Sequence, residues 1–196
     1  MRLVGSLALV AVALAALAAA AAAPPVAAGP AASSTGPAPH PALPALAKLH
    51  GATFDVAFMR ELIPVHEEAI EMALAATLNA DHPELLRWNQ AVIDRKSAQV
   101  RQMLAWLQAA GAAPGRRNAN VVTDPVKKVR SLQGAALEKT YLPLMAAHLE
   151  QSVALATLAA RKASRPEVRA MAQQIVQTEG REAAMLRDWL RQWYGK

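Results

Sequence analysis

The sequence has 196 residues, no cysteine and a formal net charge of +6, and 54% of its residues are hydrophobic while only 4% are aromatic. Without cysteine, this chain can form neither disulfides, thiolate metal sites nor iron–sulfur clusters. Its basic residues are scattered among acidic ones and are not interleaved with aromatic residues, so a nucleic-acid-binding surface is not predicted.

A signal peptide is predicted at the start of the chain, over residues 1–28. Arg2 gives a positive start, an uninterrupted apolar segment follows, and small residues suited to cleavage come after it. A retained membrane helix is the alternative, because about 20 apolar residues can span a bilayer. The alanine-rich second half of the segment favours cleavage. This predicts a periplasmic or secreted protein that is not stably inserted in the membrane once the leader is removed.

Residues 29–50 are rich in proline and alanine. This composition favours an extended tether over a packed core, so we expect a disordered linker. His40 and His50 fall in this segment and are expected to be solvated rather than to bind a ligand.

The remaining chain, residues 51–194, contains an internal repeat. Asp81-His82-Pro83-Glu84 matches Ser164-Arg165-Pro166-Glu167 at an offset of 83 residues. Each segment predicts the start of a helix, with proline in the first turn and a glutamate that bonds back to the backbone as a capping box. The two repeats are predicted over residues 53–110 and 124–193.

Four long helices are predicted, over residues 53–79, 82–110, 124–163 and 165–193. Pro64 lies inside the first and should kink or destabilise it. We expect the third helix to be broken near Gly134 or Pro143. Two consecutive helical hairpins most simply form an antiparallel bundle, so the predicted fold class is all-α, a ferritin-like four-helix bundle built from a duplicated hairpin.

The first helix of each hairpin also contains a match. Leu62-Ile63-Pro64-Val65-His66 aligns with Leu144-Met145-Ala146-Ala147-His148 at an offset of 82 residues, which pairs His66 with His148. If the two halves pack with pseudo-twofold symmetry, the two histidines should face each other across the core.

These segments resemble the domain-of-unknown-function family 305. The resemblance lies in Phe54-Asp55-x-x-Phe58-Met59, in the run ending at His66, in Ala69-Ile70-x-Met72-Ala73 and in Gln102–Leu107. It implies an exported, often duplicated helical bundle, and copper binding in some members. The family's Met-Ile-x-His-His run is incomplete here, since this alignment places Val65 and Ala147 where the first histidine of each pair would be.

A soft-metal site is one hypothesis, with copper as the metal. Imidazole and thioether groups suit Cu(I) and related ions. The resemblance and the helical spacing together give the candidate ligands His66, His148, Met59, Met72, Met103 and Met145. The alternative is a metal-free bundle with a structural or protein-binding role, in which methionine fills the core. Partners predicted under these two hypotheses are a metal ion, another protein or a second copy of the chain.

Catalysis is not predicted. No histidine has a glutamate three residues before it, which a di-iron site of this bundle class needs. The sequence contains no nucleophile elbow, phosphate-binding loop or His-Glu-x-x-His motif. The carboxylates near the histidines and on the last helix are expected on solvated faces; they are Glu67, Glu68, Glu71, Glu150, Glu179 and Glu182.

Overall fold

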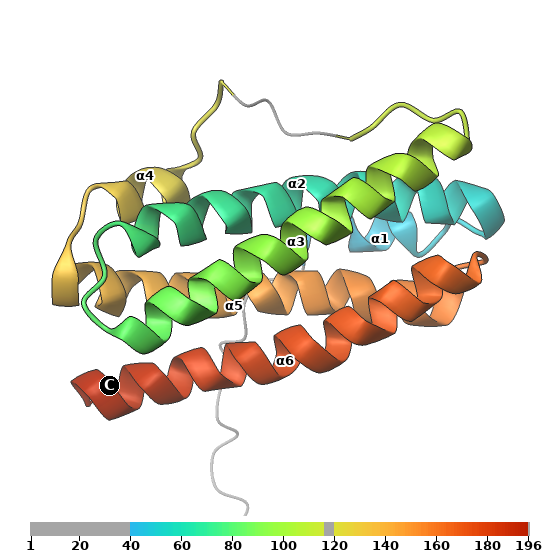
Figure 1. Ribbon diagram of the computed structural model, residues 1–196. Coiled ribbons are helices and arrows are strands. Elements are labelled where there is room, and N and C mark those ends of the chain that lie inside the picture. Colours follow the sequence, from blue (N-terminus) through green and yellow to red (C-terminus); the bar gives the residue numbers. More distant parts are fainter. Residues whose placement is uncertain (1–39, 116–119, 196) are drawn as a thin grey trace, which may run out of the picture. The chain divides into compact units, whose positions relative to one another are not determined.

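The structure is a computed structural model that describes residues 40–115 and 120–195. The helices of this part are α1 (Leu43–Leu46), α2 (Gly51–Thr77), α3 (Pro83–Ala109), α4 (Asp124–Arg130), α5 (Gly134–Lys162) and α6 (Pro166–Tyr194). The long helices form two antiparallel hairpins, α2–α3 and α5–α6, which pack together into one bundle (Figure 1). The described residues contain no strand, so the predicted all-α bundle of two hairpins is confirmed.

The predicted break in the third long helix occurs at Gly134. Here α4 ends and α5 begins, and Gly134 adopts a φ of +54°. Its N–H donates to the Asn79 carbonyl at 2.7 Å, and a Cβ there would lie 2.8 Å from an oxygen of Asp81. A left-handed conformation in so little space favours glycine. In contrast, α5 continues through Pro143 and α2 through Pro64.

The prediction of a disordered linker is wrong for its last part. Residues 43–46 form the short helix α1, and Leu46 is only 3% exposed. Leu43 and Leu49 pack partly buried against the same hydrophobic cluster. The proline-rich composition of the segment hid these three leucines, whose burial outweighs the preference for an extended tether. The predicted signal peptide and residues 29–39 lie outside the described residues.

Burial fixes the register between the two repeats. Phe54 and Phe58 of α2 correspond to Leu137 and Tyr141 of α5, 83 residues later, and all four side chains are fully buried. The same offset already relates the starts of α3 and α6, so it holds for both helices of the hairpin.

The register corrects the predicted pairing of the histidines. With an offset of 83, His66 corresponds to Leu149, and His148 corresponds to Val65. The alignment at an offset of 82 matches histidine to histidine, but it is one residue out of register with the buried positions. One residue corresponds to a rotation of about 100° around a helix, so this alignment would match the buried face of α2 with a different face of α5. The two histidines therefore stand at adjacent rather than equivalent positions of the repeat, since His148 corresponds to the residue before His66.

The predicted capping boxes do not form. The residues that precede α3 and α6 are His82 and Arg165, and neither helix has a side-chain cap from its own first turn. Instead, Glu138 of α5 accepts hydrogen bonds from the backbone N–H groups of Asp81 and His82, at 2.7 and 2.8 Å. A carboxylate from the other hairpin thus satisfies donors at the start of α3.

The start of α6 is capped in the same exchanged manner. Asp55 of α2 accepts hydrogen bonds from the N–H groups of Ser164 and Arg165, at 2.9 and 2.8 Å. Asp55 and Glu138 are equivalent positions of the two repeats, 83 residues apart. Each hairpin therefore caps the turn of the other, which joins the repeats by charge-assisted hydrogen bonds as well as by apolar packing.

Candidate functional site

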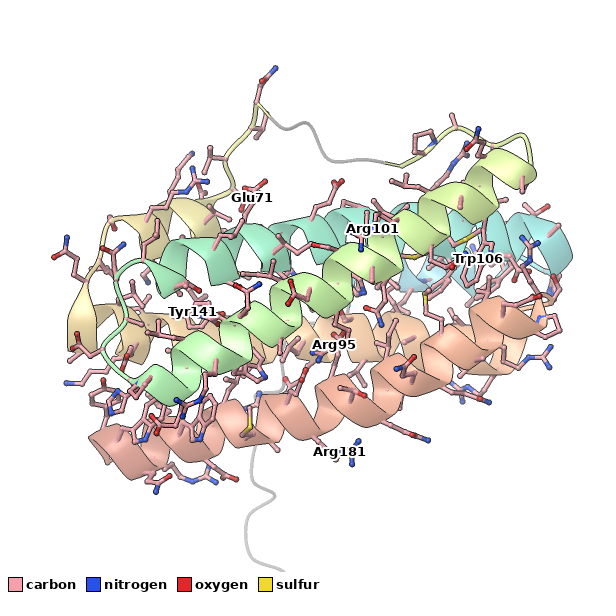
Figure 2. The ribbon with its side chains drawn as sticks, in the orientation of Figure 1. Glu71, Arg95, Arg101, Trp106, Tyr141 and Arg181 are labelled. Atoms are coloured by element: carbon pink, nitrogen blue, oxygen red, sulfur yellow. The ribbon has the colours of Figure 1, made fainter. Side chains whose placement is uncertain are left out.

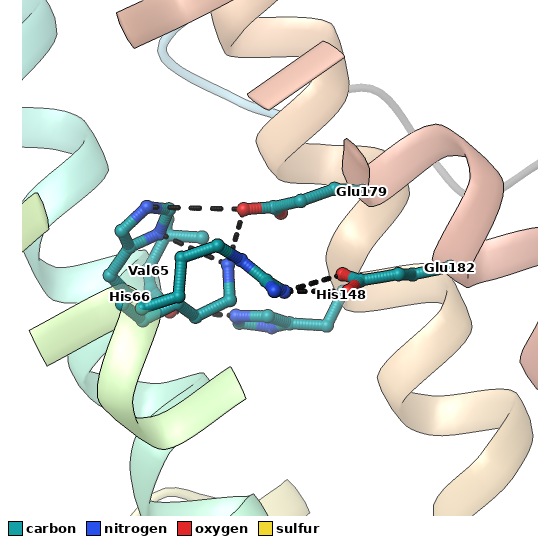
Figure 3. A network of polar contacts seen from close by, with 7 residues as sticks. Val65, His66, His148, Glu179 and Glu182 are labelled. Atoms are coloured by element: carbon teal, nitrogen blue, oxygen red, sulfur yellow. Dashed lines mark hydrogen bonds and ion pairs between the residues drawn. The ribbon is translucent and has the colours of Figure 1, made fainter. Parts of the chain in front are cut away.

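The six predicted metal ligands are all buried, but they do not form one group. Met59 and Met103 belong to one hydrophobic cluster, whereas Met72 and Met145 belong to another. The two histidines enter a polar cluster at the centre of the bundle (Figure 3). The structure thus brings together His66 and His148 and leaves the four thioethers in apolar surroundings.

Lys96 of α3 lies at the centre of this polar cluster. Its ammonium donates to Oε1 of Glu179 on α6 at 2.6 Å and to Nδ1 of His66 on α2 at 3.4 Å. Lys96 is 0% and Glu179 1% exposed, so the pair is removed from water. Glu179 was expected on a solvated helix face, and its burial contradicts that expectation. The attraction between two buried charges stabilises the fold, but removing both charges from water has a large free-energy cost.

The hydrogen bonds of the cluster fix the state of both imidazole rings. His148 donates through Nε2 to the Val65 carbonyl at 2.7 Å, so its neutral form has the lone pair on Nδ1. That Nδ1 lies 3.5 Å from Oε2 of Glu68. In His66, the Lys96 ammonium occupies Nδ1, so the ring hydrogen is on Nε2, 4.0 Å from Oε1 of Glu179. Both histidines therefore have the lone pair on the same ring atom.

The surroundings of both imidazoles favour the neutral ring. Burial first, and then the positive charge of Lys96, lower the pKa of His66 well below its ordinary value of 6.5. Burial also lowers the pKa of His148, although the Val65 carbonyl and the carboxylate of Glu68 act in the opposite direction. The neutral ring is the form that can coordinate a metal ion.

A second ion pair lies beside the cluster. Arg95 of α3 points between α3 and α6 and binds both oxygens of Glu182, at 2.7 and 2.6 Å (Figure 2). The two side chains are 23% and 14% exposed, so solvent reaches this pair but not the neighbouring Lys96–Glu179 pair. Glu182, like Glu179, is more buried than the sequence suggested.

Lys96 is the member of this cluster that was not expected from the sequence, although two signals point to it. It lies four residues after Val92 and four before Val100, two buried positions of the same helix face. Its equivalent at an offset of 83 is Glu179, which is the residue that it binds. Opposite charges at equivalent core-facing positions indicate a pair at the contact between the two repeats.

No group of three or more histidine, aspartate and glutamate side chains is placed to hold a metal ion within residues 40–115 and 120–195. Of the two Nδ1 atoms, that of His66 contacts the ammonium of Lys96 and that of His148 lies near the carboxylate of Glu68. Oε2 of Glu179 is buried without a hydrogen-bond partner in the same region. Unsatisfied buried polar atoms often mark a site where a ligand, an ion or a water molecule binds.

The model of a protein family, described as a domain of unknown function (DUF305), matches residues 12–107 and 117–196. The chain belongs to the DUF305 family. The two matched ranges correspond to the two repeats, and the resemblance noted in the sequence is confirmed. Among curated proteins, none matches the chain significantly.

Solved structures of DUF305 proteins share the fold. A DUF305 protein from Streptomyces coelicolor described as secreted is 23% identical, with a TM-score of 0.64 over 70% of this chain and 91% of that protein. A DUF305 fragment from Deinococcus radiodurans is 23% identical, with a TM-score of 0.63 over 70% of this chain and 95% of the fragment.

CopM, solved in a Cu(I)-bound form, is 24% identical and has a TM-score of 0.64 over 71% of this chain and 97% of CopM. CopM structures with Cu(II) and silver are similar as well.

In the described part of this DUF305 chain, no helix combines the length and apolar character required to cross a bilayer.

Proposed function

We propose that the protein is an exported, non-catalytic binder of copper or a related soft metal in the periplasm, and that His66 and His148 bind the metal as cargo. One observation carries the proposal: the Nδ1 lone pairs of two neutral, buried histidines each face a charged group. Nδ1 of His66 faces the ammonium of Lys96, and Nδ1 of His148 faces the carboxylate of Glu68. A metal cation would replace the first group and neutralise the second.

The surroundings of His148 support this role most directly. Two acceptor atoms, its Nδ1 and Oε2 of Glu68, lie 3.5 Å apart, an arrangement that a cation stabilises. Its Nε2–H donates to the Val65 carbonyl, the type of second hydrogen bond that orients metal-binding histidines. Glu68 is 20% exposed, so this side of the cluster borders solvent.

Similarity to CopM supports copper or silver as the kind of metal in this proposal. CopM has been solved with Cu(I), Cu(II) and silver bound, and at 24% identity the comparison establishes a common fold. Neutral imidazole nitrogen suits the same metals, and Cu(I) accepts low coordination numbers. Two imidazoles are a sufficient core for such a site.

A second candidate is a metal-free bundle with a structural or protein-binding role. The observation that favours it is the Lys96–Glu179 pair, because an ammonium already occupies Nδ1 of His66 and Oε1 of the buried carboxylate. Under this hypothesis, the family's metal site has been replaced by an internal ion pair, and the native chain binds no copper specifically.

Titration of Cu(I) against a competing chelator distinguishes the two candidates. We expect saturable binding by the native protein, and a loss of at least about tenfold in affinity for His66→Ala and for His148→Ala, since each change removes one of two nitrogen ligands. His50→Ala is the matched control, because His50 is exposed and makes no side-chain cap bond. Zn²⁺ serves as the control metal, and circular dichroism checks that each variant remains helical.

Two results would argue against the proposal. Undiminished binding by the His66→Ala/His148→Ala double variant would move the site elsewhere on the chain. No Cu(I) binding by the native protein would favour the metal-free bundle.

A further inference from the structure

The Lys96 ammonium occupies a position that a metal cation would need. It contacts two potential ligands at once, Nδ1 of His66 at 3.4 Å and Oε1 of Glu179 at 2.6 Å. All three side chains are at most 1% exposed, so no water competes for these contacts from the surface. Fully buried lysine is rare, and it requires a partner of opposite charge.

We propose that Lys96 is an internal competitor of the metal, so that metal binding requires its ammonium to leave Nδ1 of His66 and the carboxylate of Glu179. This inference rests on the proposed function and specifies how the same site is controlled. Lysine suits this role because its ammonium is a single positive charge on a flexible stem of four carbons. Displacement of the side chain exposes one imidazole nitrogen and one carboxylate together.

Charge balance indicates which metals can make this exchange. When a monovalent ion such as Cu(I) or Ag(I) replaces the ammonium beside Glu179, the net charge of the buried pair stays the same. A divalent ion would bring one more positive charge, which is costly in a region without water unless the carboxylate of Glu68 beside His148 offsets it. The nearby Arg95 and Glu182 already neutralise each other, and Glu68 lies at the solvent side, next to His148.

The test compares Ag(I) binding to the native chain and to Lys96→Leu, with silver nitrate titrated calorimetrically in a chloride-free buffer. Leucine removes the ammonium and supplies no donor atom, so any gain comes from the loss of competition. We expect Lys96→Leu to bind Ag(I) at least about tenfold more tightly than the native protein. Adding His66→Ala to Lys96→Leu should abolish this gain.

Arg95→Leu is the matched control. It removes the neighbouring residue of the same helix and also breaks an interhelical ion pair with a glutamate of α6. However, Arg95 makes no hydrogen bond to either imidazole among the contacts of the cluster. Its affinity for Ag(I) should stay within about twofold of the native value.

If Lys96→Leu does not fold because Glu179 loses its partner, the double variant Lys96→Leu/Glu179→Gln removes both charges and carries the same expectation relative to Glu179→Gln alone. Equal affinity of the native and lysine-free proteins would overturn the inference and leave the proposed function standing. Binding of Ag(I) by Lys96→Leu but not by the native protein would support the inference and rule out the proposed function. Absence of Ag(I) binding in every folded variant would overturn both.

Discussion

Substitution of Glu179 by glutamine is expected to lower the free energy of unfolding by about 3–5 kcal/mol, which is the usual effect of removing one partner of a buried ion pair. The change leaves the Lys96 ammonium, 0% exposed, without the carboxylate that lies 2.6 Å away. Glutamine keeps the size of the side chain, so the loss reports the charge rather than a cavity. Urea unfolding followed by circular dichroism measures the effect.

Two further variants show whether the loss comes from the unpaired charge. The double variant Lys96→Leu/Glu179→Leu should recover most of the stability, because apolar pairs of similar volume often replace buried ion pairs without loss. Arg95→Leu should cost only about 1 kcal/mol or less, because its pair with Glu182 is partly exposed. If Glu179→Gln were as mild as Arg95→Leu, the central ion pair would have to be solvated, contrary to the structure.

Glu138→Ala is the second substitution with a large expected effect, about 3–4 kcal/mol. Glu138 accepts hydrogen bonds from the backbone of Asp81 and His82, and its other oxygen contacts Nδ1 of His82 and the hydroxyl of Tyr194. Removing the carboxylate leaves these donors unsatisfied and releases α5 from both the α2–α3 turn and the end of α6.

Glu84→Ala is the control that separates the exchanged cap from the capping box predicted by the sequence. Glu84 is 50% exposed and pairs only loosely with Arg87, at 3.6 Å. We expect a change within about 0.5 kcal/mol. A larger loss for Glu84→Ala than for Glu138→Ala would mean that α3 is capped from its own first turn.

The contribution of Glu138 should depend on pH. Burial alone would raise the pKa of Glu138, but the hydrogen bonds from Tyr194, His82 and Asp81 outweigh it, and the pKa lies below its ordinary value of 4.5. A carboxylate whose pKa is lower in the folded state stabilises the fold above its unfolded pKa, and this stabilisation is lost as the pH falls through the folded pKa. The stability difference between the native protein and Glu138→Ala should therefore be constant near neutrality and shrink below about pH 4.5.

The helices could be predicted from the sequence because their signals are local. Proline in the first turn places the starts of α3 and α6, and a glycine that must adopt positive φ separates α4 from α5. Periodic apolar residues supply the rest. The predicted bounds of the long helices consequently differ from the observed ones by only a few residues, apart from the separation of α4 from α5.

The candidate site was less accessible to sequence reasoning because its contacts join distant segments. Lys96 and Glu179 are 83 residues apart, and each looks like an ordinary surface charge until the two repeats are packed together. The sequence alignment of His66 with His148 was one residue out of register, because matching identical residues ignored which face of α5 is buried, although the two side chains do enter one polar cluster. The position of Lys96 between Val92 and Val100, on the buried face of α3, is the sequence signal that indicates its burial.

The most direct test of the account is ¹⁵N NMR of the imidazole nitrogens during addition of Ag(I), because it observes the ligand atoms themselves. Before addition, both His66 and His148 should carry hydrogen on Nε2 at neutral pH, as their hydrogen bonds require. Metal binding should then shift the Nδ1 resonances of these two rings and leave each Nε2 protonated. Unchanged resonances for both, or shifts confined to partly or fully exposed histidines such as His50 and His82, would contradict the proposed metal site.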